Sequence, residues 1–174
     1  MSYRGLGQGV LFLLVLVFFE TTHSRALGQN TAAQAKQEKT AVLVEGLLAD
    51  LPTGTLYSLD PYPKLDLPRG RQFQGYPILG QWPLALTHER REVYKVFLKS
   101  IRNNPRGDVA ECFMPRHGLR IQISGGRVDF LICYQCLTVR MIQDHAHEEF
   151  AIDKGGGVFF NAFLKKRGVP LSHL

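Results

Sequence analysis

Residues 119–132, LRIQISGGRVDFLI, decide the fold, because two runs of alternating apolar residues flank a pair of glycines. Gly125 and Gly126 both accept positive φ without strain, so residues 124–127 predict a two-residue hairpin turn. Counting outward from this turn opposes three apolar pairs, which are Ile123 with Val128, Ile121 with Phe130, and Leu119 with Ile132. Side chains alternate along a strand, so all six share the face that packs on the core.

In the second strand of the hairpin, the alternating apolar residues switch from even-numbered to odd-numbered positions. The core-facing series Val128, Phe130 and Ile132 is even-numbered, whereas the apolar series Leu137, Val139 and Met141 is odd-numbered. This change predicts one extra residue, a β-bulge within residues 133–136. Cys133 and Cys136 would point to opposite faces of a straight strand, but a bulge lets them share one face.

All three cysteines lie at this end of the hairpin, with a histidine near them. The candidate site has four members, which are Cys112, His117, Cys133 and Cys136. One interpretation is that the thiols are buried apolar groups beside a hydrogen-bonded histidine. A second is a disulfide between Cys112 and either Cys133 or Cys136, and a third is a structural zinc ion held by all four residues. No catalytic residue is proposed.

Flanking segments complete an α+β class, a small antiparallel sheet with a central Gly-Gly hairpin, packed against two or three helices. Further strands are predicted over residues 56–59, 76–86 and 109–113. Helices are predicted over residues 88–102 and 158–167 from the helical spacing of their apolar residues. The second of these predicted strands contains two prolines, so we expect it at an edge or with a bulge.

Two further segments resemble ligand-binding motifs but have simpler structural interpretations. Residues 155–157 are three glycines without the lysine and hydroxyl residue of a phosphate-binding loop, so they predict a flexible lead into the last helix. Residues 144–149, DHAHEE, contain two histidines, and their composition predicts a solvated loop rather than a metal site.

The N-terminal region predicts export. Residues 1–28 carry a basic residue, an apolar run at residues 10–19 and small residues near position 28, which is typical of a cleaved signal peptide. Residues 29–54 predict a linker and a short docking helix, and residues 55–174 a single α+β domain. The expected location is therefore periplasmic or extracellular, with no transmembrane helix after cleavage.

Charge gives little information on partners. The formal net charge is +6, and it becomes +5 without residues 1–28, which hold two basic residues and one acidic residue. The basic residues are spread along the chain, which does not indicate a specific nucleic-acid partner. A weak association with acidic envelope surfaces is the expectation.

Four segments of the chain carry a resemblance, and these are LYSLDP at residues 56–61, FQGYPILG at 73–80, CFMPRHG at 112–118 and LICYQC at 131–136. The chain resembles a group of bacterial, mostly exported proteins with LYSLDP, F-x-G-[YW]-x-[VI]-L-G, C-x2-PRHG and ICF-x-C segments in that order. The resemblance covers most of residues 55–174. It implies export and brings no activity, cofactor or catalytic residue.

These observations lead to one functional hypothesis and one rival. The first is an exported, non-enzymatic binding or structural module whose Cys/His cluster stabilises one end of a β-hairpin. The rival is a thiol- or metal-dependent enzyme in which Cys133 or Cys136 is the nucleophile or ligand and His117 is the base.

Overall fold

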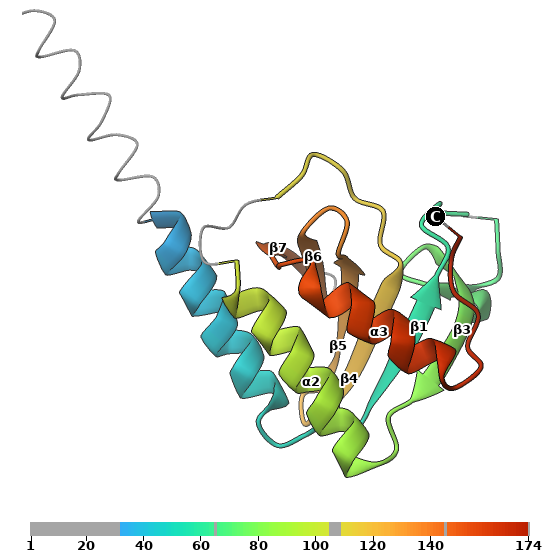
Figure 1. Ribbon diagram of the computed structural model, residues 1–174, viewed down its shortest axis with the longest axis horizontal. Coiled ribbons are helices and arrows are strands. Elements are labelled where there is room, and N and C mark those ends of the chain that lie inside the picture. Colours follow the sequence, from blue (N-terminus) through green and yellow to red (C-terminus); the bar gives the residue numbers. More distant parts are fainter. Residues whose placement is uncertain (1–31, 65, 105–108, 145, 174) are drawn as a thin grey trace, which may run out of the picture.

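The predicted hairpin lies in the middle of a seven-stranded antiparallel sheet (Figure 1). The computed structural model describes residues 32–64, 66–104, 109–144 and 146–173, and the predicted signal peptide lies outside these ranges. The α+β class is confirmed, because these residues form one sheet and a layer of helices. The sheet is larger than the small sheet expected from the sequence.

The strands pair in the order β2-β3-β1-β4-β5-β6-β7, and every neighbouring pair is antiparallel. Their bounds are β1 Gly54–Leu59, β2 Gln72–Phe73, β3 Tyr76–Pro83, β4 His117–Ile123, β5 Gly126–Cys133, β6 Thr138–Gln143 and β7 Ala146–Ala151. Strand β2 covers only the first two residues of β3, so most of β3 is the sheet edge that its prolines predict.

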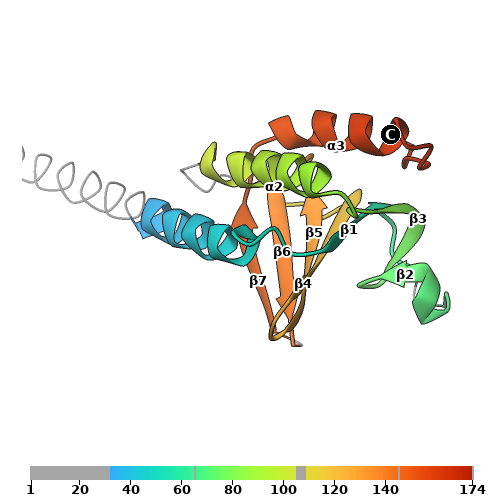
Figure 2. The same ribbon diagram turned by 90° about the horizontal axis from the view of Figure 1, so that it is seen from below.

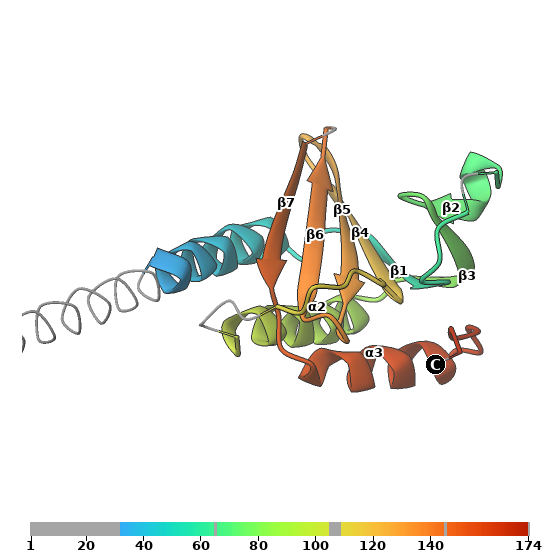
Figure 3. The same cartoon turned by 90° about the horizontal axis from the view of Figure 1, so that it is seen from above.

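Helices lie on one side of this sheet, which we call the helix face (Figures 2 and 3). They are the N-terminal helix (residues 32–48), α2 (Thr87–Arg102) and α3 (Gly155–Lys165). A short 3-10 helix, η1 (Arg69–Arg71), precedes β2. Over the described ranges, no helix combines the length and the apolar character that a membrane crossing needs.

The hairpin turn lies one residue earlier than predicted, which shifts the pairing of the two strands by two residues. Ile123 pairs with Gly126, so the turn residues are Ser124 and Gly125, and only Gly126 has positive φ (130°). A shift of two residues keeps every side chain on its expected face, because the side-chain period of a strand is two. The predicted faces are therefore correct although the predicted pairs are wrong.

The shifted register improves the polar pairing on the other side of the sheet, which we call the far face. Arg120 now opposes Asp129 rather than Leu131 and donates two hydrogen bonds to its carboxylate, at 2.7 and 2.6 Å. Gln74 donates a third, at 2.7 Å. Because Asp129 is only 1% exposed, these donors compensate a charge that would otherwise be costly to bury.

The predicted bulge in β5 is wrong. The strand ends at Cys133, the chain turns over residues 134–137, and β6 begins at Thr138 opposite Cys133. The turn closes with Leu137 in the left-handed conformation (φ 57°), which sequence patterns associate with glycine or asparagine. A tight turn and a bulge both move the core-facing residues from even to odd positions. The apolar pattern therefore does not distinguish a turn from a bulge.

Two other predicted segments differ in the structure. Residues 146–149 belong to β7, which pairs with β6 along its whole length, so the solvated loop is wrong for them; His145 lies outside the described residues. Residues 109–113 form no strand and instead pass beside the β5–β6 turn, where the Ala110 amide donates to the Cys136 carbonyl at 3.0 Å.

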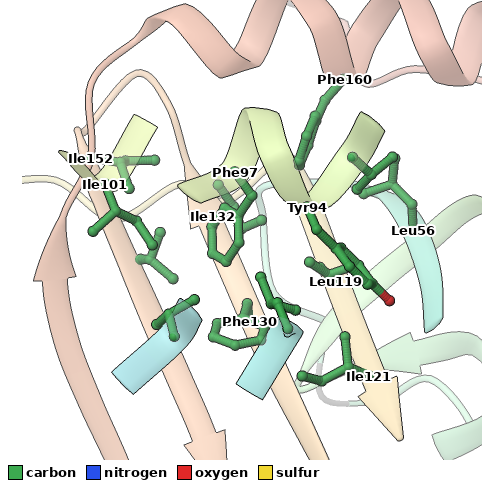
Figure 4. Close-up of a cluster of buried hydrophobic side chains, with 14 of the residues drawn as sticks. Leu56, Tyr94, Phe97, Ile101, Leu119, Ile121, Phe130, Ile132, Ile152 and Phe160 are labelled. Carbon is green, nitrogen blue, oxygen red and sulfur yellow. The ribbon is translucent and has the colours of Figure 1, made fainter. Parts of the chain in front are cut away.

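The main core fills the space between the helices and the helix face (Figure 4). Phe97 of α2 packs edge-on against Phe130 of β5, with 5.1 Å between ring centroids. Most of the predicted apolar residues of α2 and of the hairpin are fully buried here, and these are Val93, Phe97, Ile101, Leu119, Ile121, Val128, Phe130 and Ile132. Val96 and Ile123 are only partly buried at its margin. Burying them is the main driving force that fixes the two layers together.

A side chain of the N-terminal helix joins the helix layer to the sheet edge. The buried Gln37 amide donates to the Ile101 carbonyl at 3.0 Å and to the Ala151 carbonyl at 2.6 Å. The Ala151 amide in turn donates to the Gln37 side-chain oxygen at 3.4 Å. Gln37 thus bonds to the last residue of β7 through both backbone groups, as a neighbouring strand would.

The three glycines belong to α3 rather than to a flexible lead. Gly156 and Gly157 are buried against Tyr134, whose ring packs edge-on to Phe160 with 5.5 Å between centroids. A Cβ on Gly156 would lie 2.7 Å from two carbons of that ring, and a Cβ on Gly157 would lie 3.0 Å from the Tyr134 Cβ. The glycines therefore allow the helix backbone to touch the ring.

Gly156→Ala tests this close approach. We expect it to lower the free energy of unfolding by roughly 1–3 kcal/mol, because the buried ring cannot retreat from the new methyl group. Gly155→Ala is the matched control, since its Cβ would meet only the Asp153 carboxylate, at 3.4 Å. Urea denaturation should show the control unchanged or more stable, and equal losses in both variants would contradict the packing argument.

Candidate functional site

The structure joins Cys133 to Cys136 by a disulfide, with 5.2 Å between their Cα atoms. The bond closes the β5–β6 turn, and the Cys136 amide also donates to the Cys133 sulfur at 3.1 Å. This pairing is neither of the two disulfides considered from the sequence, because both of those used Cys112. A straight strand would keep the two sulfurs apart, whereas the turn brings them together.

Cys112 keeps a free, partly exposed thiol next to this disulfide. Its segment is attached to the turn on both sides, since Ala110 donates to the Cys136 carbonyl at 3.0 Å and Met114 donates to the Cys136 sulfur at 3.4 Å. The segment around Cys112 therefore lies against Cys136.

The His117 side chain points to the opposite face of the sheet from the cysteines. Its ring lies on the helix face, where Nε2 shares a hydrogen bond of 2.9 Å with the Asn161 side chain of α3. The rings of Tyr134 and Phe160 pack against it edge-on, at 5.7 and 5.6 Å. Cys133 has the same parity as Leu131 and so belongs to the far face.

The structure does not bring Cys112, His117, Cys133 and Cys136 together as the four ligands of one zinc ion. Two of the thiols are consumed by the disulfide, and the imidazole lies across the sheet from them. Across the described ranges, no group of three or more His, Cys, Asp and Glu side chains is placed to hold a metal ion.

A pocket of about 510 Å³, which we call the thiol pocket, opens beside Cys112. Three separate parts of the chain form its walls, namely the start of the N-terminal helix, residues 109–113, and the paired strands β6 and β7. Across its floor Arg140 donates two hydrogen bonds to Glu149, at 2.8 and 2.6 Å. The Arg140 guanidinium also lies 4.3 Å from the centre of the Phe113 ring, a cation–π contact.

The sequence analysis missed this pocket. Arg140 and Glu149 are opposite each other in the paired strands β6 and β7, but the composition of residues 144–149 predicts a loop and so does not indicate this pair. The contribution of the N-terminal helix had no sequence signal, because it depends on how Gln37 docks.

Comparisons with protein-family models, with curated proteins and with solved structures found no match.

The disulfide makes a prediction about reductants. In the chain-entropy estimate, a loop this short stabilises the fold by about 1–2 kcal/mol, and a reductant should remove that stability from wild type. The stability of Cys112→Ser should still fall in the reductant, whereas the stability of Cys136→Ser should not. A chelator should change the stability of neither variant. Urea denaturation with and without a phosphine reductant measures this, and an insensitive Cys112→Ser would rule out the Cys133–Cys136 pairing.

A second prediction concerns pH. Burial lowers the pKa of His117 from 6.5 to about 4, although the Asn161 hydrogen bond acts to raise it. As pH falls from 6.5 to 4, the His117 imidazole becomes protonated in the unfolded chain but stays neutral in the folded chain. The free energy of unfolding should therefore fall by up to roughly 3 kcal/mol. Below pH 4 this histidine adds no further pH dependence.

His117→Gln is the control, because it keeps a polar partner for Asn161 and does not titrate. Urea denaturation at pH 7, 5.5 and 4.5 should show a smaller acid loss in this variant than in wild type. Equal losses would mean that His117 is not the neutral, buried group described above.

Proposed function

We propose that the protein is an exported, non-enzymatic binding module whose ligand lies in the thiol pocket. The observation that carries this proposal is the pocket itself, whose volume of about 510 Å³ is that of a small-molecule site. Export rests on the signal-like residues 1–28 and on the resemblance to bacterial exported proteins, and it makes the periplasm or the extracellular space the location.

The charges around the pocket favour a zwitterionic ligand with an apolar side chain, such as a short peptide. Two cations, two carboxylates and the aromatic ring of Phe113 line it, and the charged residues are Lys36, Arg140, Glu111 and Glu149. The cations suit the carboxylate of such a ligand and the acids suit its ammonium group. The Phe113 ring supplies apolar surface for its side chain.

The rival, a thiol- or metal-dependent enzyme, receives less support. It needs a base or a further ligand beside the thiols, and His117 was the residue proposed for that role. The His117 ring is buried on the helix face, and its pKa of about 4 makes it a poor base near neutral pH.

A weak association with acidic envelope surfaces is a separate part of the proposal. The exposed side of α2 supports it, because three basic residues follow one another at helical spacing there, namely Arg91, Lys95 and Lys99. Such a row would add a salt-sensitive attraction to anionic surfaces without a specific contact.

Titration calorimetry with alanyl-phenylalanine tests the ligand class. We expect binding to wild type and at least tenfold weaker binding to Arg140→Gln, a loss of about 1.4 kcal/mol. Arg127→Gln is the matched control, since it removes the same charge at the exposed start of β5, outside the thiol pocket. Blocking both termini of the dipeptide should also abolish binding. Equal affinities for the two variants would contradict the proposed site.

A further inference from the structure

We infer that Cys112, Cys133 and Cys136 form a thiol–disulfide exchange site, in which Cys112 can replace Cys133 as the partner of Cys136. This inference does not depend on the proposed ligand. It rests on the disulfide, on the free thiol beside it and on the two hydrogen bonds that fasten the Cys112 segment to Cys136.

The geometry selects Cys136 as the sulfur that is attacked. Cys112 lies two residues from Ala110 and two from Met114, and both of these donate hydrogen bonds to Cys136. Two residues span at most about 7 Å, and a disulfide needs its Cα atoms about 4.4–6.8 Å apart. Residues 111–113 belong to no helix or strand, so a local adjustment of this segment brings Cys112 to Cys136.

The exchange balances without any other reactant. The Cys112 thiol loses its proton to water in the thiol pocket, and the thiolate attacks the Cys136 sulfur. The Cys112–Cys136 bond forms while the Cys133–Cys136 bond breaks, and its electron pair leaves on Cys133 as a thiolate that then takes a proton from water. The Cys136 amide, which already donates to the Cys133 sulfur at 3.1 Å, stabilises this leaving group.

The two isomers differ in the thiol pocket. With Cys133 bonded to Cys136, the Cys112 thiol lines the pocket and is open to reagents. With Cys112 bonded to Cys136, this thiol is withdrawn and the wall formed by residues 109–113 is tied covalently to the β5–β6 turn. The site is therefore a point at which small thiols and disulfides can act on the protein.

Disulfide mapping of the full chain tests the exchange. The oxidised protein is held at pH 8, quenched in acid, alkylated with N-ethylmaleimide under acidic denaturing conditions, and digested with trypsin. We expect peptides 107–116 and 128–140 to be linked in part of the sample, with at least ten times more label on Cys133 than on Cys136. Absence of the linked peptide, or equal labelling of the two cysteines, would overturn the inference.

Two serine variants give an independent measure. In a glutathione redox buffer, where oxidised glutathione supplies the oxidant, Cys133→Ser should form the Cys112–Cys136 disulfide at an effective concentration at least tenfold above that of Cys112–Cys133 in Cys136→Ser. Circular dichroism establishes that each variant is folded. A folded Cys133→Ser that accumulates only glutathione adducts, or no difference between the variants, would also overturn it.

Discussion

The β5–β6 turn joins the two faces of the sheet, because it sends Tyr134 to one side and the sulfurs of Cys133 and Cys136 to the other. Tyr134 packs against His117 and Phe160 and against Gly156 and Gly157 of α3, so the position of that helix depends on this ring. On the far side, Cys136 receives hydrogen bonds from the segment that carries Cys112. One short turn thus positions both the last helix and the wall of the thiol pocket.

The elements with a clear period were predictable from the sequence. Strands β1 and β3, helix α2 and the faces of the hairpin follow from alternating or helical spacing of apolar residues, and burial of one face leaves few other solutions. The register of the hairpin was not predictable, because a slip of two residues leaves every side chain on the same face of the sheet. The pairing of Arg120 with Asp129 is one feature that separates the two registers, and neither residue is apolar, so the apolar pattern does not reveal it.

The candidate site was predictable in part. Counting along the chain brought the cysteines to one end of the hairpin, and the structure keeps them there. The partner of each sulfur and the direction of His117 depend on whether residues 133–136 bulge or turn. Leu137 in a left-handed conformation and the packing of Gly156 and Gly157 under Tyr134 are consequences of tertiary packing, so local propensities alone could not reveal them.

The hydrogen bonds between Gln37 and Ala151 cover part of the exposed edge of the sheet. Strand β7 is an outer strand, and unpaired backbone groups on such a strand can recruit strands from other molecules and start aggregation. Gln37 occupies both backbone groups of Ala151, so the N-terminal helix protects the end of β7 that lies nearest the core. Fragments that begin at β1 would lack this protection and would be expected to self-associate through β7.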